Sequence, residues 1–76
     1  MQLNIEVTDT FSGEANYAWV RRYTLDVIDT LSDYSIMRRV KAAVGWTGKR
    51  CMVHRYGDML EIRPQGECQV CFVSFN

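Results

Sequence analysis

The chain has 76 residues, which allow one domain with one modest core, because a chain of this length buries only about 60% of its unfolded surface. Apolar residues make up 47% of the sequence and proline occurs once, a composition typical of compact globular domains and not of disordered segments. Nine basic and nine acidic residues cancel, which argues against a protein whose main task is to neutralise a phosphate backbone. We therefore expect a single domain over residues 1–76.

The N-terminal stretch M-Q-L-N-I-E-V-T-D contains no basic cluster and no long apolar run. It predicts neither a secretory signal nor a membrane span. Three cysteines, an odd number, fit free thiols in a reducing compartment better than a disulfide framework. We expect a cytoplasmic protein without a membrane partner.

Two strands are predicted in the first third of the chain. Leu3, Ile5 and Val7 alternate with polar residues, which is the period of a strand with one buried face. A similar alternation, rich in aromatic and β-branched residues, runs from Trp19 to about Val27. Residues 9 to 17 are expected to join the two strands as a long connection. Phe11 and Trp19 are expected to help close the core.

One amphipathic helix of three turns follows. Ser32 is placed as its N-cap, and Gly45 is placed to take the left-handed conformation that ends a helix, with Trp46 folding back onto Val40. The residues expected on its apolar side are Ile36, Met37, Val40, Ala43 and Val44, and those on its solvent side are Arg38, Arg39 and Lys41.

The last third predicts a hairpin and a final strand. Gly57 and Asp58 form a two-residue turn, which places Val53 opposite Ile62 and His54 opposite Glu61. The run C-Q-V-C-F-V-S-F after Pro64-Gln65-Gly66 is apolar on both alternations, as in the middle of a sheet. The sequence thus predicts an α+β fold of order β-β-α-β-β-β, a five-stranded, mainly antiparallel sheet with one helix across one face and the last strand between the first and the fourth.

Three short patterns resemble a zinc site, a redox C-x-x-C motif and a hydrolase serine, but each lacks a feature that the chemistry requires. Cys51 and His54, followed by Cys68 and Cys71, have the spacing of zinc ligands, but residues three apart on an extended strand face opposite sides and cannot converge on one ion. The second pair lacks the following helix that a redox C-x-x-C needs. Ser12-Gly13 lacks the nucleophile elbow of a hydrolase. We predict no catalytic residue, no metal site and no cofactor, and we expect a protein that is not an enzyme.

Charged residues are distributed unevenly along the chain, with six of the nine acids in residues 1 to 33 and seven of the nine bases in residues 38 to 63. The folded protein is therefore expected to carry a charged face, with Arg22, Arg38 and Arg39 as candidate partner contacts. Arginines and aromatic residues on a sheet also allow single-stranded bases to stack, so direct nucleic-acid binding stays open as an alternative. Arg21 and Arg55 lie on otherwise apolar alternations, where they are expected to extend toward solvent or pair with acids.

The segment D-T-F-S-G-E-A-N-Y-A-W-V holds the other candidate binding residues. Short polar side chains such as Asp9 and Asn16 bond readily to nearby backbone and can brace a turn. A braced turn does not require Glu14 and Tyr17, and ordered loops on rigid scaffolds are common recognition sites. We therefore predict that Glu14, Asn16 and Tyr17 contact a partner.

This segment, together with A-A-V-G-W-T-G and the Y-G-D…E-I-R-P…C-Q-V hairpin, resembles small phage- and prophage-encoded proteins of unassigned function. Small phage proteins of this size and stand-alone α+β build resemble anti-CRISPR and other anti-defence inhibitors, which act by occupying a surface on a host complex. The resemblance implies a non-enzymatic protein of the host cytosol that binds and blocks a host protein or ribonucleoprotein complex. A nucleic-acid-binding accessory protein and a small structural or assembly factor are the alternatives.

Overall fold

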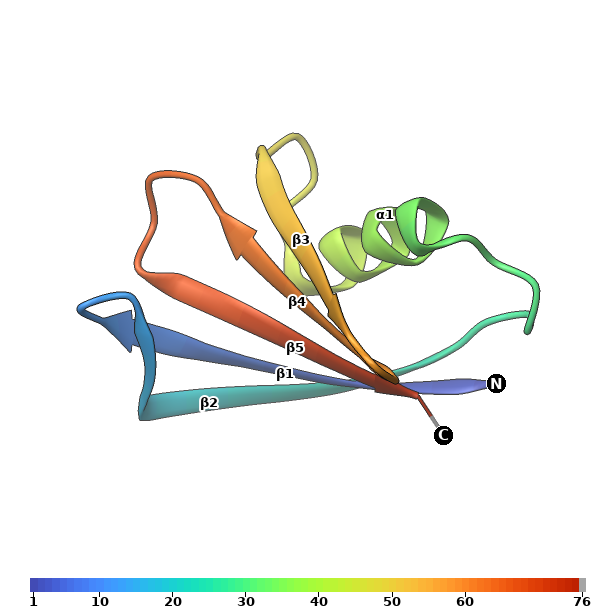
Figure 1. Ribbon diagram of the computed structural model, residues 1–76, viewed down its shortest axis with the longest axis horizontal. Helices are drawn as coiled ribbons and strands as arrows, with labels where there is room; N and C mark the ends of the chain where they lie inside the picture. Colours follow the sequence, from blue (N-terminus) through green and yellow to red (C-terminus); the bar gives the residue numbers. More distant parts are fainter. Residues whose placement is uncertain (76) are drawn as a thin grey trace.

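A computed structural model describes residues 1–75 as one five-stranded sheet with one helix. The elements in chain order are β1 (Gln2–Phe11), β2 (Glu14–Asp26), α1 (Asp33–Val44), β3 (Cys51–Tyr56), β4 (Met59–Pro64) and β5 (Gln69–Phe75). The strands lie in the order β2-β1-β5-β4-β3 and every neighbouring pair is antiparallel (Figure 1). The predicted element order, sheet and central position of the last strand are confirmed.

The sheet and α1 share one core because the strands present an apolar residue at every second position. In β1 the residues Leu3, Ile5 and Val7 are buried, and in α1 the buried residues are Ile36 and Val40. These side chains pack in one cluster with residues of β4 and β5. Each fully buried side chain of this kind stabilises the fold by roughly 1.5–3 kcal/mol, so the core fixes which side of α1 faces the sheet.

The ends of α1 follow the predicted capping residues. The Ser32 hydroxyl accepts a hydrogen bond from the Ser35 backbone N–H at 3.2 Å, as an N-cap does. Gly45 has a φ of 83° and ends the helix in the left-handed conformation. Trp46 then returns into the core beside Val40, as predicted, whereas Ala43 stays exposed instead of joining the apolar side.

The β3–β4 hairpin has the predicted register. Tyr56 pairs with Met59 across Gly57-Asp58, and the φ of 58° at Gly57 suits the first central position of a mirror-image turn. His54 lies opposite Glu61, as predicted. Arg55 forms an ion pair with Asp33 at 2.7 Å, which connects this hairpin to the first turn of α1.

No helix within residues 1–75 has the length and apolar character that crossing a bilayer requires.

Candidate partner-binding surfaces

The connection between β1 and β2 is shorter than the sequence predicts. Only Ser12 and Gly13 lie between the strands, and their φ angles of 53° and 82° are those of a tight mirror-image hairpin turn. The long connection expected over residues 9 to 17 is therefore wrong, and β2 begins at Glu14 and not near Trp19. The expectation failed because an irregularity in β2 hides its strand period.

That irregularity is a large bulge in β2. Thr8 of β1 pairs with Val20, and pairing resumes with Thr10 opposite Ala15. Residues 16 to 19 of β2 thus oppose a single residue of β1, so several of their backbone groups have no ladder partner. We call residues 9 to 19 the hairpin end; in Figure 1 it lies at the opposite end of the sheet from both termini.

The Asp9 carboxylate bonds to residues of the bulge that have no partner in the strand ladder. One carboxylate oxygen accepts the Ala18 backbone N–H at 2.8 Å and the other accepts the Asn16 side-chain N–H at 2.8 Å. The Asn16 amide is the main cause that holds the pKa of Asp9 below its ordinary value, with the backbone N–H of Ala18 acting in the same direction. Asn16, predicted to contact a partner, is therefore engaged within the chain.

Thr8 satisfies two further backbone groups of the bulge from a fully buried position. Its hydroxyl accepts the Tyr17 backbone N–H and donates to the Trp19 carbonyl oxygen, both at 3.0 Å. Tyr17 is held with a φ of 57°, which is unusual for a residue other than glycine. The polar residues of the hairpin end therefore brace the chain, as the sequence suggested, but they brace a bulge and not a loop.

Two aromatic residues of the hairpin end are not in the core. Phe11 is 73% exposed and Trp19 is 37% exposed, so the prediction that they close the core is wrong. The hairpin end projects beyond α1, so the helix cannot cover them (Figure 1). Arg21 instead lies over the Trp19 ring at 5.2 Å. Glu14 and Tyr17 are also exposed, Tyr17 by 53%, so both are available to a partner.

The side of the sheet opposite α1, which we call the open face, carries a row of side chains across all five strands. The row runs through Arg22, Glu6, Phe72, Glu61 and His54. Arg22 lies 3.5 Å from Glu6. A hollow of about 370 Å³ lies beside this pair. The predicted contact residue Arg22 is therefore paired within the sheet, on the side away from α1.

Glu61, which the sequence predicts only as the cross-strand neighbour of His54, is an acidic residue of the open face. It is only 9% exposed and bonds to Arg63 at 3.0 Å and to the Tyr56 hydroxyl at 3.4 Å. Arg63 also donates to the Gly13 carbonyl oxygen at 2.7 Å, so it links β4 to the hairpin turn. The strand period could have placed Glu61 and Arg63 on one face, but only the twist of the sheet brings Gly13 to Arg63.

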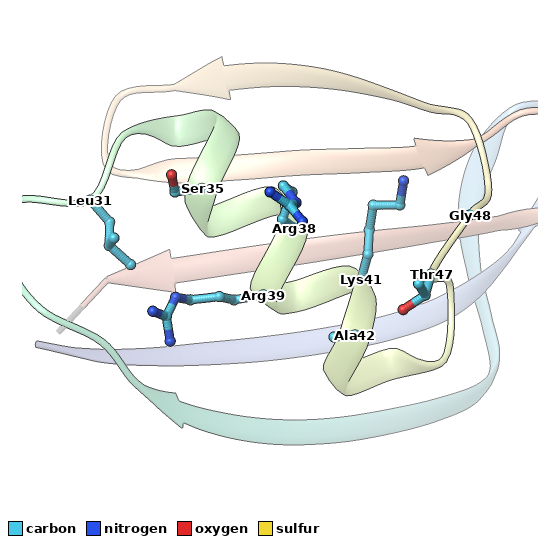
Figure 2. A pocket seen from close by; sticks show the side chains of 8 residues that line it. All are labelled: Leu31, Ser35, Arg38, Arg39, Lys41, Ala42, Thr47 and Gly48. Carbon is cyan, nitrogen blue, oxygen red and sulfur yellow. The ribbon is translucent and has the colours of Figure 1, made fainter.

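The solvent-facing side of α1, which we call the outer helix surface, carries the remaining predicted contacts. Arg38 and Arg39 are exposed, and Figure 2 shows both side chains leaving α1 among the residues that line a hollow. A hollow of about 590 Å³ lies along this surface. Its lining residues are Leu31, Ser35, Arg38, Arg39, Lys41, Ala42, Thr47 and Gly48.

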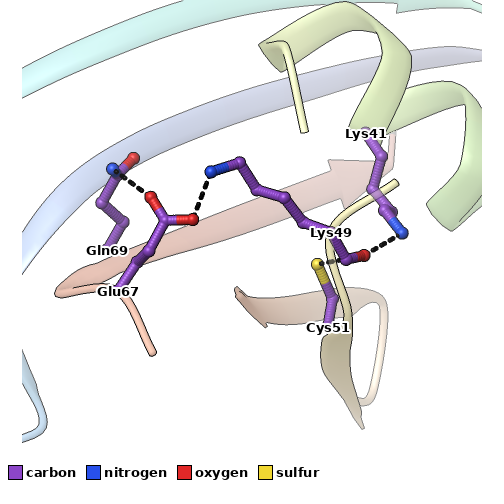
Figure 3. A network of polar contacts seen from close by, with 5 residues as sticks. All are labelled: Lys41, Lys49, Cys51, Glu67 and Gln69. Atoms are coloured by element: carbon purple, nitrogen blue, oxygen red, sulfur yellow. Dashed lines mark hydrogen bonds and ion pairs between the residues drawn. The ribbon is translucent and has the colours of Figure 1, made fainter. Parts of the chain in front are cut away.

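The two arginines of this hollow have no acidic partner among residues 1–75, where the ion pairs involve other cations. Lys41 differs, because its ammonium donates to the Lys49 carbonyl oxygen. Figure 3 shows that Lys49 in turn pairs with Glu67, which connects the segment after α1 to the start of β5. The two lysines therefore bond within the chain, whereas the guanidinium groups of Arg38 and Arg39 remain exposed to solvent.

The six predicted contact residues thus lie on three surfaces. Arg38 and Arg39 share the outer helix surface, Arg22 lies on the open face, and the other three, Glu14, Asn16 and Tyr17, lie at the hairpin end.

The cysteines differ in exposure. Cys68 is exposed, Cys51 is half-buried, and Cys71 is buried among the core residues. Burial raises the pKa of Cys51, and it raises the pKa of Cys71 to about 12. Within the described residues, no group of three or more His, Cys, Asp or Glu side chains is arranged to hold a metal ion.

Comparison with protein-family models, with curated proteins and with solved structures finds no match to this chain.

Proposed function

We propose that this chain is a small non-enzymatic phage-type protein that binds and blocks a host macromolecular complex, as an anti-CRISPR or another anti-defence inhibitor does, and that the outer helix surface makes the contact. The observation that carries the proposal is the hollow beside Arg38 and Arg39, whose guanidinium groups have no acidic partner within residues 1–75. The resemblance of the sequence to small phage proteins supplies the biological setting.

Two exposed arginines on one helix suit an anionic contact. A guanidinium presents donors in a planar fork that fits carboxylates and phosphates, and arginine is frequent among the residues that dominate binding energy. The partner surface is therefore acidic, formed by carboxylates of a protein or by exposed phosphates of a ribonucleoprotein.

The scaffold holds these arginines in place before binding. The opposite side of α1 is fixed by the buried residues Ile36 and Val40, and both helix ends are capped. A rigid helix loses little backbone freedom when a partner docks, so more of the interaction energy appears as affinity.

The proposal can be tested by expressing the chain in bacterial strains that each carry one active defence system, beginning with CRISPR systems, and measuring plaque formation by a targeted phage. The wild-type chain should raise plaquing in at least one strain, and the double variant Arg38→Gln/Arg39→Gln should abolish the increase. Glutamine keeps helix propensity and length, so the variant should melt like the wild type.

The matched control is Arg21→Gln/Arg22→Gln. It also removes two adjacent arginines, but from β2. The control variant should keep the effect on plaquing. The proposal fails if the wild-type chain changes plaquing in no strain, or if both arginine pairs prove equally dispensable.

Nucleic-acid binding is the second candidate, because unpaired guanidinium groups also fit phosphates. Fluorescence anisotropy with a single-stranded and a duplex oligonucleotide separates the two. A nucleic-acid binder would bind the oligonucleotide and lose affinity steeply as salt rises, whereas an inhibitor that docks on protein should bind neither.

A further inference from the structure

The sheet has two edge strands, β2 and β3, and they are protected differently. β2 has a bulge and exposes Arg21, Arg22 and Asp26, which are features that discourage a further strand from pairing. β3 pairs with β4 without a bulge from Cys51 to Tyr56 and contains neither proline nor lysine, and its one arginine, Arg55, pairs with Asp33 of α1. Within residues 1–75, no strand pairs with its outer edge.

The pairing of β3 with β4 shows which backbone groups face outward. The Gln65 N–H donates to the Arg50 carbonyl oxygen at 2.8 Å, and Tyr56 closes a two-residue turn with Met59. In an antiparallel ladder such bonds recur at every second residue, so the even-numbered residues of β3 bond to β4. The N–H and C=O groups of Cys51, Val53 and Arg55 therefore point away from the sheet. In Figure 2, where the ribbon keeps the colours of Figure 1, β3 is the outermost strand and no other segment runs beyond it.

The side chains of β3 on the open face match a second copy of the same strand. Met52 is 53% exposed and Tyr56 is 54% exposed, and His54 lies between them. When two β3 strands pair antiparallel about a two-fold axis at His54, Met52 of each copy lies opposite Tyr56 of the other. On the helix side the same register places Val53 of one copy opposite Arg55 of the other. The outward backbone N–H and C=O groups of these two residues can then bond to each other.

A neighbouring register does not give this match. Centred on Val53, it would place Met52 opposite His54 of the second copy and leave Tyr56 beyond the paired strands. Methionine against an aromatic ring is a favourable contact, and tyrosine is a frequent anchor at interfaces. The sequence of β3 is therefore self-complementary in one register.

We propose that the protein forms a two-fold symmetric dimer in which β3 pairs antiparallel with β3 of a second copy about His54, joining the two five-stranded sheets into one. The occupant of this edge is another molecule of the same chain. The dimer goes beyond the proposed function and does not depend on it, because Arg38 and Arg39 lie outside β3.

Cysteine cross-linking tests the register. At the two-fold axis the two His54 residues form a non-hydrogen-bonded pair with Cα atoms about 4.5 Å apart, a separation that a disulfide spans. The variant His54→Cys, in a Cys68→Ser background that removes the exposed native thiol, should form a covalent dimer under mild oxidation. The control Met52→Cys in the same background should cross-link far more slowly, because its partner is Tyr56.

Sedimentation analysis tests the dimer without cross-linking. The wild-type chain should sediment as a dimer, and Met52→Glu should raise the dimer dissociation constant by about tenfold or more, since the change removes two apolar contacts per dimer. Adding Tyr56→Lys to Met52→Glu should recover part of the lost affinity, because each introduced carboxylate then faces an introduced ammonium.

Circular dichroism should show that all these variants remain folded, since the four changed positions, 52, 54, 56 and 68, are exposed in one copy. A monomeric wild-type chain, equal cross-linking at positions 52 and 54, or a double variant that dimerises no more tightly than Met52→Glu alone would overturn the proposed dimer.

Discussion

The hairpin end and the outer helix surface both hold polar side chains that the sequence marks for binding, and they differ in whether those side chains bond within the chain. At the hairpin end the Asn16 side chain donates to Asp9, which also accepts the Ala18 backbone N–H in the bulge of β2, so Asn16 is part of a brace. On the outer helix surface Arg38 and Arg39 line a hollow without an acidic partner within residues 1–75. Residue type alone does not separate a brace from a binding site, whereas the bonds made within the chain do.

Substitutions on the two sides of α1 should differ most in their effect on the free energy of unfolding. Val40→Asp should destabilise the fold on the order of 3 kcal/mol or more, because it places an unpaired carboxylate among buried apolar side chains. Arg39→Glu should leave the melting temperature almost unchanged, since the side chain is exposed. Thermal melting of both variants checks this. Equal melting temperatures would mean that the helix presents another side to the sheet.

Removing the brace should disturb the hairpin end alone. Asp9→Ala leaves the Ala18 N–H and the Asn16 amide without their acceptor, so amide hydrogen exchange should accelerate in the bulge of β2 and stay slow in β5. The matched control is Glu14→Ala, a carboxylate of the same hairpin that does not take part in the brace. Unchanged exchange at Ala18 after Asp9→Ala would show that the carboxylate does not hold the bulge.

Acid should loosen the same bulge. The pKa of Asp9 in the folded chain lies below its ordinary value of 3.8, so its carboxylate stabilises the fold above that pH, and this contribution disappears as the pH falls through the lower folded pKa. The amide resonance of Ala18, followed by NMR during acid titration, should report this transition below pH 3.8. Asp9→Asn should remove the transition, and a midpoint above the ordinary value in the wild-type chain would contradict the brace.

The smallest expected effect on stability concerns the exposed residues of the hairpin end. Glu14→Ala together with Tyr17→Ala should keep near-wild-type melting and circular dichroism, because neither side chain takes part in the brace. If the hairpin end also contacts the partner, this variant loses affinity on the order of 2 kcal/mol through the tyrosine. Full retention of binding would remove Glu14 and Tyr17 from the contact surface.

The sequence was sufficient for elements whose signals are local. The strand period of β1, the caps Ser32 and Gly45, and the turn at Gly57 all act within a few residues, and each is found as predicted. The central position of β5 also followed from local composition, since a strand that is apolar on both alternations avoids an edge.

The sequence was insufficient where distant segments decide the outcome. The bulge of β2 breaks the strand period, so residues 14 to 18 resemble a loop although they belong to the strand. Phe11 is a residue type that is usually buried, but here it is exposed, because α1 does not extend over its end of the sheet. The helical period correctly places Arg38 and Arg39 on the solvent side of α1. The hollow beside them cannot be predicted in this way, because Thr47 and Gly48 from the segment after the helix also line it.

We propose that the outer helix surface makes the contact with a host complex. The most direct measurement is the dissociation constant of the purified chain for the complex isolated from the strain in which it raises plaquing. Arg38→Gln/Arg39→Gln should weaken binding by about 100-fold or more, since each charged hydrogen bond contributes about 1.5–3 kcal/mol, and Arg21→Gln/Arg22→Gln should leave it within about twofold. Equal dissociation constants for the two double variants would show that Arg38 and Arg39 do not form the contact.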